Sequence, residues 1–145
     1  MVIGSGFITI HIYIVIYCSP KAVIMYQTGA ILYILWGLLH VFAAFQVFKL
    51  GAKLEKGMVQ GRIYQNALNL FFFAIIVIVI AAVYNWKNNP LGYWLNLVLA
   101  SITDIGFIIY ILRPGYLPLK PGILGPALWI LAMIFSTVGI LFITP

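Results

Sequence analysis

Long apolar runs separated by short polar breaks dominate the chain. Four runs stand out, at about 29–49, 64–86, 92–112 and 124–144. A helix of about 20 residues rises about 30 Å, which is the thickness of the hydrocarbon core of a bilayer. We therefore expect each run to cross a membrane as a helix.

The breaks between the runs are short and contain residues that end helices. Residues 51–61 are polar and basic, 87–90 read Lys-Asn-Asn-Pro, and 113–122 contain prolines and glycines. Proline removes a backbone donor and clashes with the preceding turn, so these segments predict turns or connectors. Short connections between neighbouring helices predict an all-α, up-and-down bundle.

Residues 1–24 are apolar and rich in isoleucine, with His11 in their middle. They lack the basic start and small-residue cleavage site of a signal peptide. Two interpretations stay open: a fifth, short membrane helix, or an extension in front of a natural start near Met25. We favour the membrane helix, with residues 25–145 as the four-helix transmembrane domain.

Composition supports the membrane assignment. The chain has 145 residues, 65% of them hydrophobic and 7% charged. Soluble domains are about a quarter charged, and a small globule has too little interior to hide so much apolar surface. We predict a single-domain integral membrane protein that contacts membrane lipids.

Basic residues predict the orientation of the bundle. The formal net charge is +6, and the basic residues lie between the apolar runs. This placement suits anionic headgroups, and no basic stripe suggests nucleic-acid binding. The first connector and its flanks carry Lys49, Lys53, Lys56 and Arg62, the last connector carries Arg113 and Lys120, and the opposite side carries Lys21 and Lys87. The positive-inside rule places the first and last connectors in the cytoplasm and the C-terminus outside, in an inner or plasma membrane.

Cofactor chemistry finds little support in the residue types. One cysteine and two histidines cannot supply a four-ligand zinc site. No phosphate loop, His-Glu-x-x-His helix or Gly-x-Ser-x-Gly elbow occurs. We expect no metal and no cofactor.

The informative residues are polar ones deep inside the apolar runs. Asp104 is the only acidic residue within a predicted span, and His40 is the only histidine in the four firm spans. Counting from the predicted cytoplasmic ends places His40 roughly 13 Å deep and Asp104 roughly 12 Å deep. An ionisable group inside a membrane is costly and suggests function, so we predict a ligand or proton site at this level, with a purely structural pairing of His40 and Asp104 as the alternative.

Helical spacing predicts which residues share this site. Tyr33, Trp36, Gly37, His40, Ala44 and Val47 fall on one face of the first helix, and Asn96, Ala100, Thr103, Asp104 and Phe107 share one arc of the third. We expect Asn96, Asn69 and Ser136 to line the site, and Trp36 to serve packing or to face lipid. Ala132, Ser136 and Gly139 form a small-residue face that favours close helix packing.

Three functions stay open. The leading hypothesis is binding or translocation of a small or lipophilic molecule, coupled to protons through His40 and Asp104. The second is a membrane enzyme acting on a lipid-like substrate at the cytoplasmic interface, with Arg62, Asn66 and Tyr116. The third is a non-catalytic assembly subunit. We expect a homo-oligomer in each case, because four helices of this size rarely enclose a cavity alone.

Overall fold

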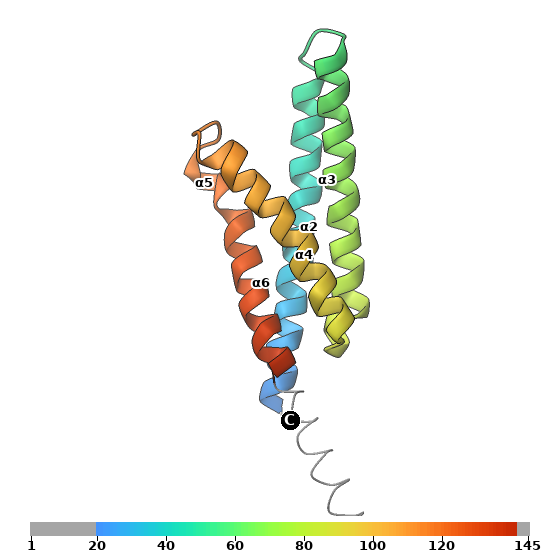
Figure 1. Ribbon diagram of the computed structural model, residues 1–145, viewed down its shortest axis with the longest axis vertical. Helices are drawn as coiled ribbons and strands as arrows, with labels where there is room; N and C mark the ends of the chain where they lie inside the picture. Colours follow the sequence, from blue (N-terminus) through green and yellow to red (C-terminus); the bar gives the residue numbers. More distant parts are fainter. Residues whose placement is uncertain (1–19, 142–145) are drawn as a thin grey trace, which may run out of the picture.

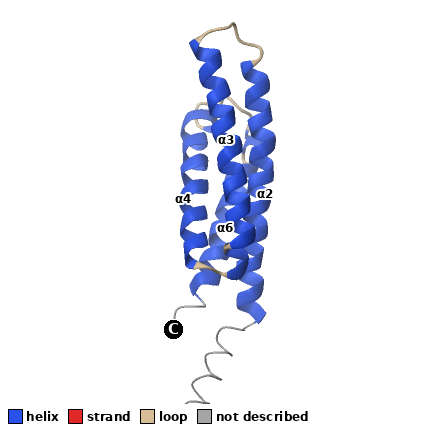
Figure 2. Cartoon of the chain, turned by 90° about the vertical axis from the view of Figure 1, so that its right-hand side faces the viewer, coloured by secondary structure: helices blue, strands red, loops and turns tan. Residues whose placement is uncertain are grey.

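The computed structural model describes residues 20–141, and they form a bundle of antiparallel helices (Figures 1 and 2). The helices are α2 (Pro20–Gly51), α3 (Met58–Val83), α4 (Pro90–Phe107), α5 (Leu119–Gly122) and α6 (Leu124–Leu141), with a 3-10 turn η1 (Asn85–Lys87) and a π-helical turn η2 (Ile108–Leu112). Four stretches are long and apolar enough to cross a membrane: α2, α3 with η1, α4 with η2, and α6. The predicted all-α membrane bundle is confirmed for this part of the chain, whereas the expected helix within residues 1–24 falls largely outside it.

Two helices are longer than the hydrophobic pattern predicted. α2 begins at Pro20 rather than near residue 29, and α3 begins at Met58 rather than near residue 64. Proline is tolerated in the first turn of a helix, where its missing N–H has no partner to lose. Apolar runs mark the part of a helix that lies in lipid, whereas hydrogen bonding continues through polar residues at the interface. As a result α2, with 32 residues, is about 48 Å long.

The turn between α3 and α4 is tight and fully bonded. Asn89 caps α4 by accepting a hydrogen bond from the Leu91 N–H, and Pro90 opens the helix. Asn88 adopts the left-handed conformation and donates its amide to the Gly139 carbonyl of α6. The turn therefore also anchors the last helix.

α5 lies within the connector that we predicted as non-helical, but Lys120 inside it has an extended rather than a helical backbone, so residues 113–122 contain no regular helical turn. The rest of that connector follows the prediction. η2 ends at Leu112, immediately before the proline- and glycine-containing stretch.

α2 forms the centre of the bundle, with α3 packed along one side and α6 along another. Small residues allow both contacts. A side-chain carbon at Gly37 would lie 2.4 Å from Ile78 of α3, and one at Gly29 would lie 2.4 Å from the Ser136 hydroxyl of α6. The core that results is lined by Tyr33, Trp36, Val77, Ala81, Ala100 and Ala132. In a membrane such close backbone contact supplies the packing that drives helix association.

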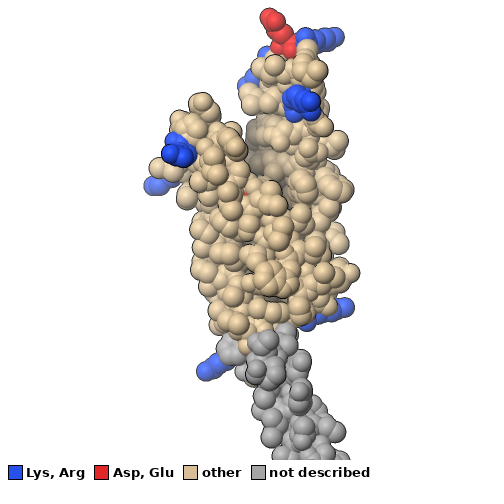
Figure 3. Space-filling model, in the orientation of Figure 1, with Lys and Arg blue, Asp and Glu red and all other residues tan. Residues whose placement is uncertain are grey.

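Charged side chains gather at the two ends of the molecule (Figure 3). Between them the visible face is an uncharged band. The connector between α2 and α3 and the connector that contains α5 lie at the same end (Figure 1). This distribution agrees with a multi-pass membrane protein whose helices alternate in direction.

Candidate functional site

His40 and Asp104 meet inside the bundle. The His40 Nε2 and Asp104 Oδ1 atoms are 3.8 Å apart, and both residues are buried, with 7% and 0% of their surface exposed. This distance is too long for a hydrogen bond but short enough for an ion pair. The two side chains predicted to lie at one depth are thus neighbours, held by α2 and α4.

Trp36 connects the pair. Its indole Nε1–H donates to Asp104 Oδ2 at 2.5 Å, and its carbonyl oxygen lies 2.8 Å from His40 Nδ1. The indole also stacks on the His40 ring, with ring centroids 3.8 Å apart. Residues four apart share a helix face, so α2 presents both rings to α4.

The first turn of α6 closes the site. A side-chain carbon at Gly125 would lie 3.1 Å from His40 Cε1 and 3.4 Å from Asp104 Oδ1. Glycine therefore lets the start of α6 lie against both groups.

The hydrogen bonds determine where a proton can sit. A carbonyl oxygen only accepts, so the Nδ1 of His40 carries a hydrogen that it donates to Trp36. Asp104 Oδ2 accepts from the indole, which leaves Nε2 of His40 facing Asp104 Oδ1, an atom with no hydrogen-bond partner. One proton on either atom makes the pair neutral overall, whether as two neutral groups or as an ion pair.

Comparison of the chain with models of protein families, with curated proteins and with solved structures finds no match. The function is therefore inferred from the geometry of the site.

Asn96 lies on the same buried face of α4 as Asp104, but it takes part in a different contact. Its amide nitrogen donates to the Val77 carbonyl, at 3.3 Å, and to the Asn85 side-chain oxygen, at 3.2 Å. Eight residues separate it from Asp104, which is about 12 Å along a helix. The structure thus places Asn96 at the α3–α4 corner, outside the His40 site.

Asn69 and Asn66 are exposed on the outer surface of α3. The expectation that Asn69 lines the site is therefore wrong. The buried face of α3 includes Ala67 and Ala74, and a step of two residues turns a helix by about 200°. Asn69 consequently points away from α2.

Ser136 is buried but lies at the other end of α6. It packs against Gly29, and its hydroxyl has no hydrogen-bond partner. Eleven residues separate it from Gly125, or about 16 Å. Ser136 therefore does not join His40 and Asp104, and a hydrolase triad of these three residues is excluded in this arrangement.

The residues expected at the cytoplasmic interface do not converge. Arg62 is exposed on α3 and donates to the side chain of Gln65, within the same helix. Tyr116 is 77% exposed in the connector before α5, which Figure 1 shows apart from the start of α3. The structure therefore does not assemble Arg62, Asn66 and Tyr116 into one site.

Trp36 packs in the core, as expected, but it also donates a hydrogen bond to Asp104, which the sequence analysis did not predict. Its position four residues before His40, on the same helix face, was the available signal.

Within residues 20–141, no three His, Cys, Asp or Glu side chains lie close enough to hold a metal ion.

Proposed function

We propose that this protein binds or translocates a small or lipophilic molecule across a membrane, coupled to the proton shared by His40 and Asp104. The observation that carries the proposal is the unpartnered Asp104 Oδ1 facing His40 Nε2 inside an apolar bundle. A charge in this setting is expensive, so the pair favours the neutral state with one proton. Loss of that proton leaves one negative charge, which either a proton or a cationic molecule neutralises.

Coupling requires that the pair be reached from water at some stage. In this conformation Asp104 is fully buried, so access requires a movement of the helices around it. The π-helical turn η2 begins four residues after Asp104, and the Ile108 N–H is shared between the carbonyls of Asp104 and Ile105. Such turns often occur at functional sites, where they interrupt the regular hydrogen-bond ladder. We place the hinge for this movement at η2.

Replacement of Asp104 by Asn and of His40 by Ala tests the site. Proteoliposomes with each variant are compared with wild type for binding or flux of a panel of small and lipophilic molecules. Trp129→Phe is the control, because it removes an indole that donates to Ser101 rather than to Asp104. Both site variants are expected to lose the activity that the control keeps. Flux or binding that survives both replacements contradicts the proposal.

The orientation follows from the charges. The α2–α3 and α4–α5 connectors are proposed to be cytoplasmic, since they and their flanks hold six of the eight basic residues. Alkaline phosphatase, which is active only outside the cytoplasm, is fused after residue 54 or after residue 88. The first fusion is expected to be inactive and the second active. The reverse result overturns the orientation.

The exposed amides of Asn66 and Asn69 support a homo-oligomer. Both lie after Arg62 in the apolar part of α3, where an amide that faces lipid has no partner. Asparagine side chains commonly hydrogen-bond between helices in membranes. A second copy that apposes the same face of α3 pairs these amides.

A further inference from the structure

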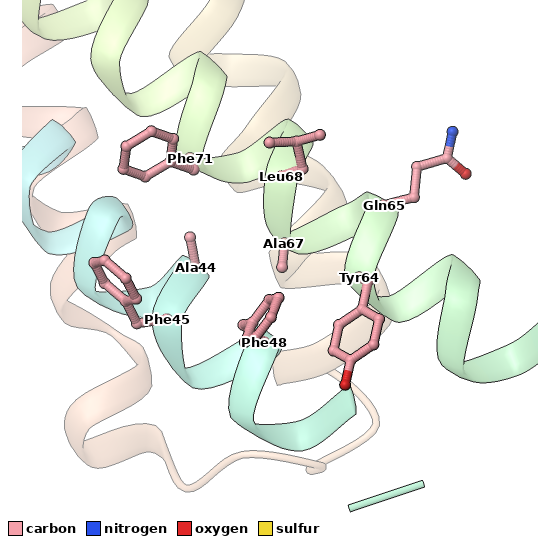
Figure 4. Close-up of a pocket in the computed structure, with 8 residues that line it drawn as sticks. All are labelled: Ala44, Phe45, Phe48, Tyr64, Gln65, Ala67, Leu68 and Phe71. Atoms are coloured by element: carbon pink, nitrogen blue, oxygen red, sulfur yellow. The ribbon is translucent and has the colours of Figure 1, made fainter. Parts of the chain in front are cut away.

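A groove opens on the surface between α2 and α3 (Figure 4), and its first lining residue on α2, Ala44, follows His40 by one helical turn. Its volume is about 520 Å³, and its lining is almost wholly apolar. The lining residues are Ala44, Phe45, Phe48, Tyr64, Gln65, Ala67, Leu68 and Phe71. This size is typical of a site for a small molecule or one chain of a lipid.

Small residues form the floor of the groove and aromatic rings form its ends. Ala44 and Ala67 are buried and approach each other across the helix pair (Figure 4). Phe48 stacks on Tyr64 at one end, with ring centroids 4.6 Å apart. At the other end Phe45 meets Phe71 edge to face, at 6.4 Å. The groove therefore has aromatic walls and a depth that larger side chains in place of the alanines would remove.

The groove runs from the end of the molecule that holds the α2–α3 connector toward the uncharged band between the two ends. Lys49 follows Phe48 directly in α2, and Arg62 lies three residues before the lining residue Gln65 on α3, which is the spacing of side chains that meet on one helix surface. Arg62 also donates a hydrogen bond to Gln65, which lines the groove. From Tyr64 to Phe71 the groove extends about 10 Å along α3, toward the centre of the bilayer. An amphipathic ligand with an anionic head and an apolar chain fits this polarity.

We propose that the groove holds one acyl chain of an anionic phospholipid, with its phosphate at Lys49 and Arg62. The charge complementarity decides between this occupant and a neutral lipid. A basic residue at the membrane surface favours an anionic lipid about fivefold. The inference does not depend on the His40 site, so failure of one leaves the other standing.

Native mass spectrometry of the intact detergent-solubilised chain, titrated with phosphatidylglycerol or phosphatidylcholine, tests the headgroup contact. Arg62→Gln is compared with Lys87→Gln in η1, beyond the far end of α3, which removes the same charge away from the groove. Wild type is expected to bind phosphatidylglycerol several-fold more tightly than phosphatidylcholine. Arg62→Gln is expected to lower phosphatidylglycerol affinity about fivefold without changing phosphatidylcholine affinity. Equal affinity of wild type for the two lipids overturns the proposal.

Two substitutions test the apolar part of the groove. Ala67→Leu fills the floor, and its control is Ala82→Leu on the exposed surface of the same helix. Phe45→Ala removes one aromatic wall of the groove, and the fold is expected to tolerate it because the Phe45 side chain is exposed. Its control is Phe42→Ala, which removes another exposed ring of α2 outside the groove. Each groove variant is expected to bind both lipids more weakly than its control.

The same spectra report how many copies of the chain are present. Groove variants that bind lipid like their controls overturn the proposal. A groove variant that instead converts a dimer to a monomer, with lipid binding unchanged, assigns the groove to a second copy and also overturns it.

Discussion

Replacement of Trp36 by Phe removes the one hydrogen bond that the structure gives to the Asp104 carboxyl group. Phenylalanine keeps an aromatic ring against His40 but has no N–H to donate. A hydrogen bond to a charged group contributes about 1.5–3 kcal/mol, and the cost is fully felt when the acceptor stays buried. We therefore expect the free energy of unfolding to fall by about this amount, with a further loss from the smaller ring.

A double-mutant cycle separates these two losses. Asp104→Leu removes the acceptor, so Trp36→Phe in that background costs only the loss of packing. The coupling between the two substitutions is expected to be about 1.5–3 kcal/mol, which is within the range found for residues in contact. Unfolding is followed by circular dichroism as a denaturing detergent is titrated into a mild one.

Trp129→Phe is the matched control for this cycle. The Trp129 indole donates to the Ser101 hydroxyl at 3.0 Å, which is a neutral acceptor in a partly buried position. Hydrogen bonds between membrane helices are worth about 0.6 kcal/mol on average, so this replacement is expected to cost much less. Additive effects of Trp36→Phe and Asp104→Leu, within about 0.5 kcal/mol, would refute the assignment of Trp36 as the residue that holds Asp104.

Three further substitutions separate structural from functional positions. Gly37→Ala is expected to destabilise the bundle by about 1–3 kcal/mol in the unfolding assay, because the added carbon collides with Ile78. Its control is Gly106→Ala, where the added carbon meets nothing within 4 Å, and this variant is expected to be neutral or stabilising. Asn96→Ala is expected to cost about 1–3 kcal/mol, because it removes the amide that donates to the Val77 carbonyl and the Asn85 side chain, while flux through the His40 site stays intact. A specific loss of flux would argue against a structural role for Asn96. Asn69→Leu is expected to leave the unfolding of the single chain unchanged but to lower the oligomer fraction, measured by size-exclusion chromatography with light scattering. An unchanged oligomer fraction would argue against this face of α3 as the interface.

The bundle and the common depth of its two buried ionisable residues could be predicted from the sequence, because each rests on a strong energetic constraint. Apolar runs of membrane length have few alternatives to a spanning helix. An acid and a histidine inside such runs are costly unless they are paired or solvated, so they mark a level of interest, but only the structure shows that the two side chains are neighbours. The faces of the first and third runs were also predicted well, since Tyr33, Trp36, Gly37 and His40 are all buried on α2.

The remaining contacts depend on how the helices are rotated and which of them are neighbours. Asn69 was predicted to face inward, but α3 has an apolar surface in every direction, so its pattern does not reveal which side meets α2. Gly125 could not be linked to Asp104 because no periodicity shows that α6 begins against that level. Trp36 was assigned to packing because an aromatic residue on a buried helix face usually packs, and only the location of Asp104 shows that its indole has an acceptor.

The most direct test of the central claim is a pH jump on protein adsorbed to a solid-supported membrane. A proton that enters the His40–Asp104 pair moves charge through part of the bilayer, and the transient current it produces requires no other substrate. Wild type and Trp129→Phe are expected to give this current, and Asp104→Asn and His40→Ala are expected to abolish it. A wild-type protein that gives no current, or a current that survives both replacements, would contradict a proton-coupled site at this pair.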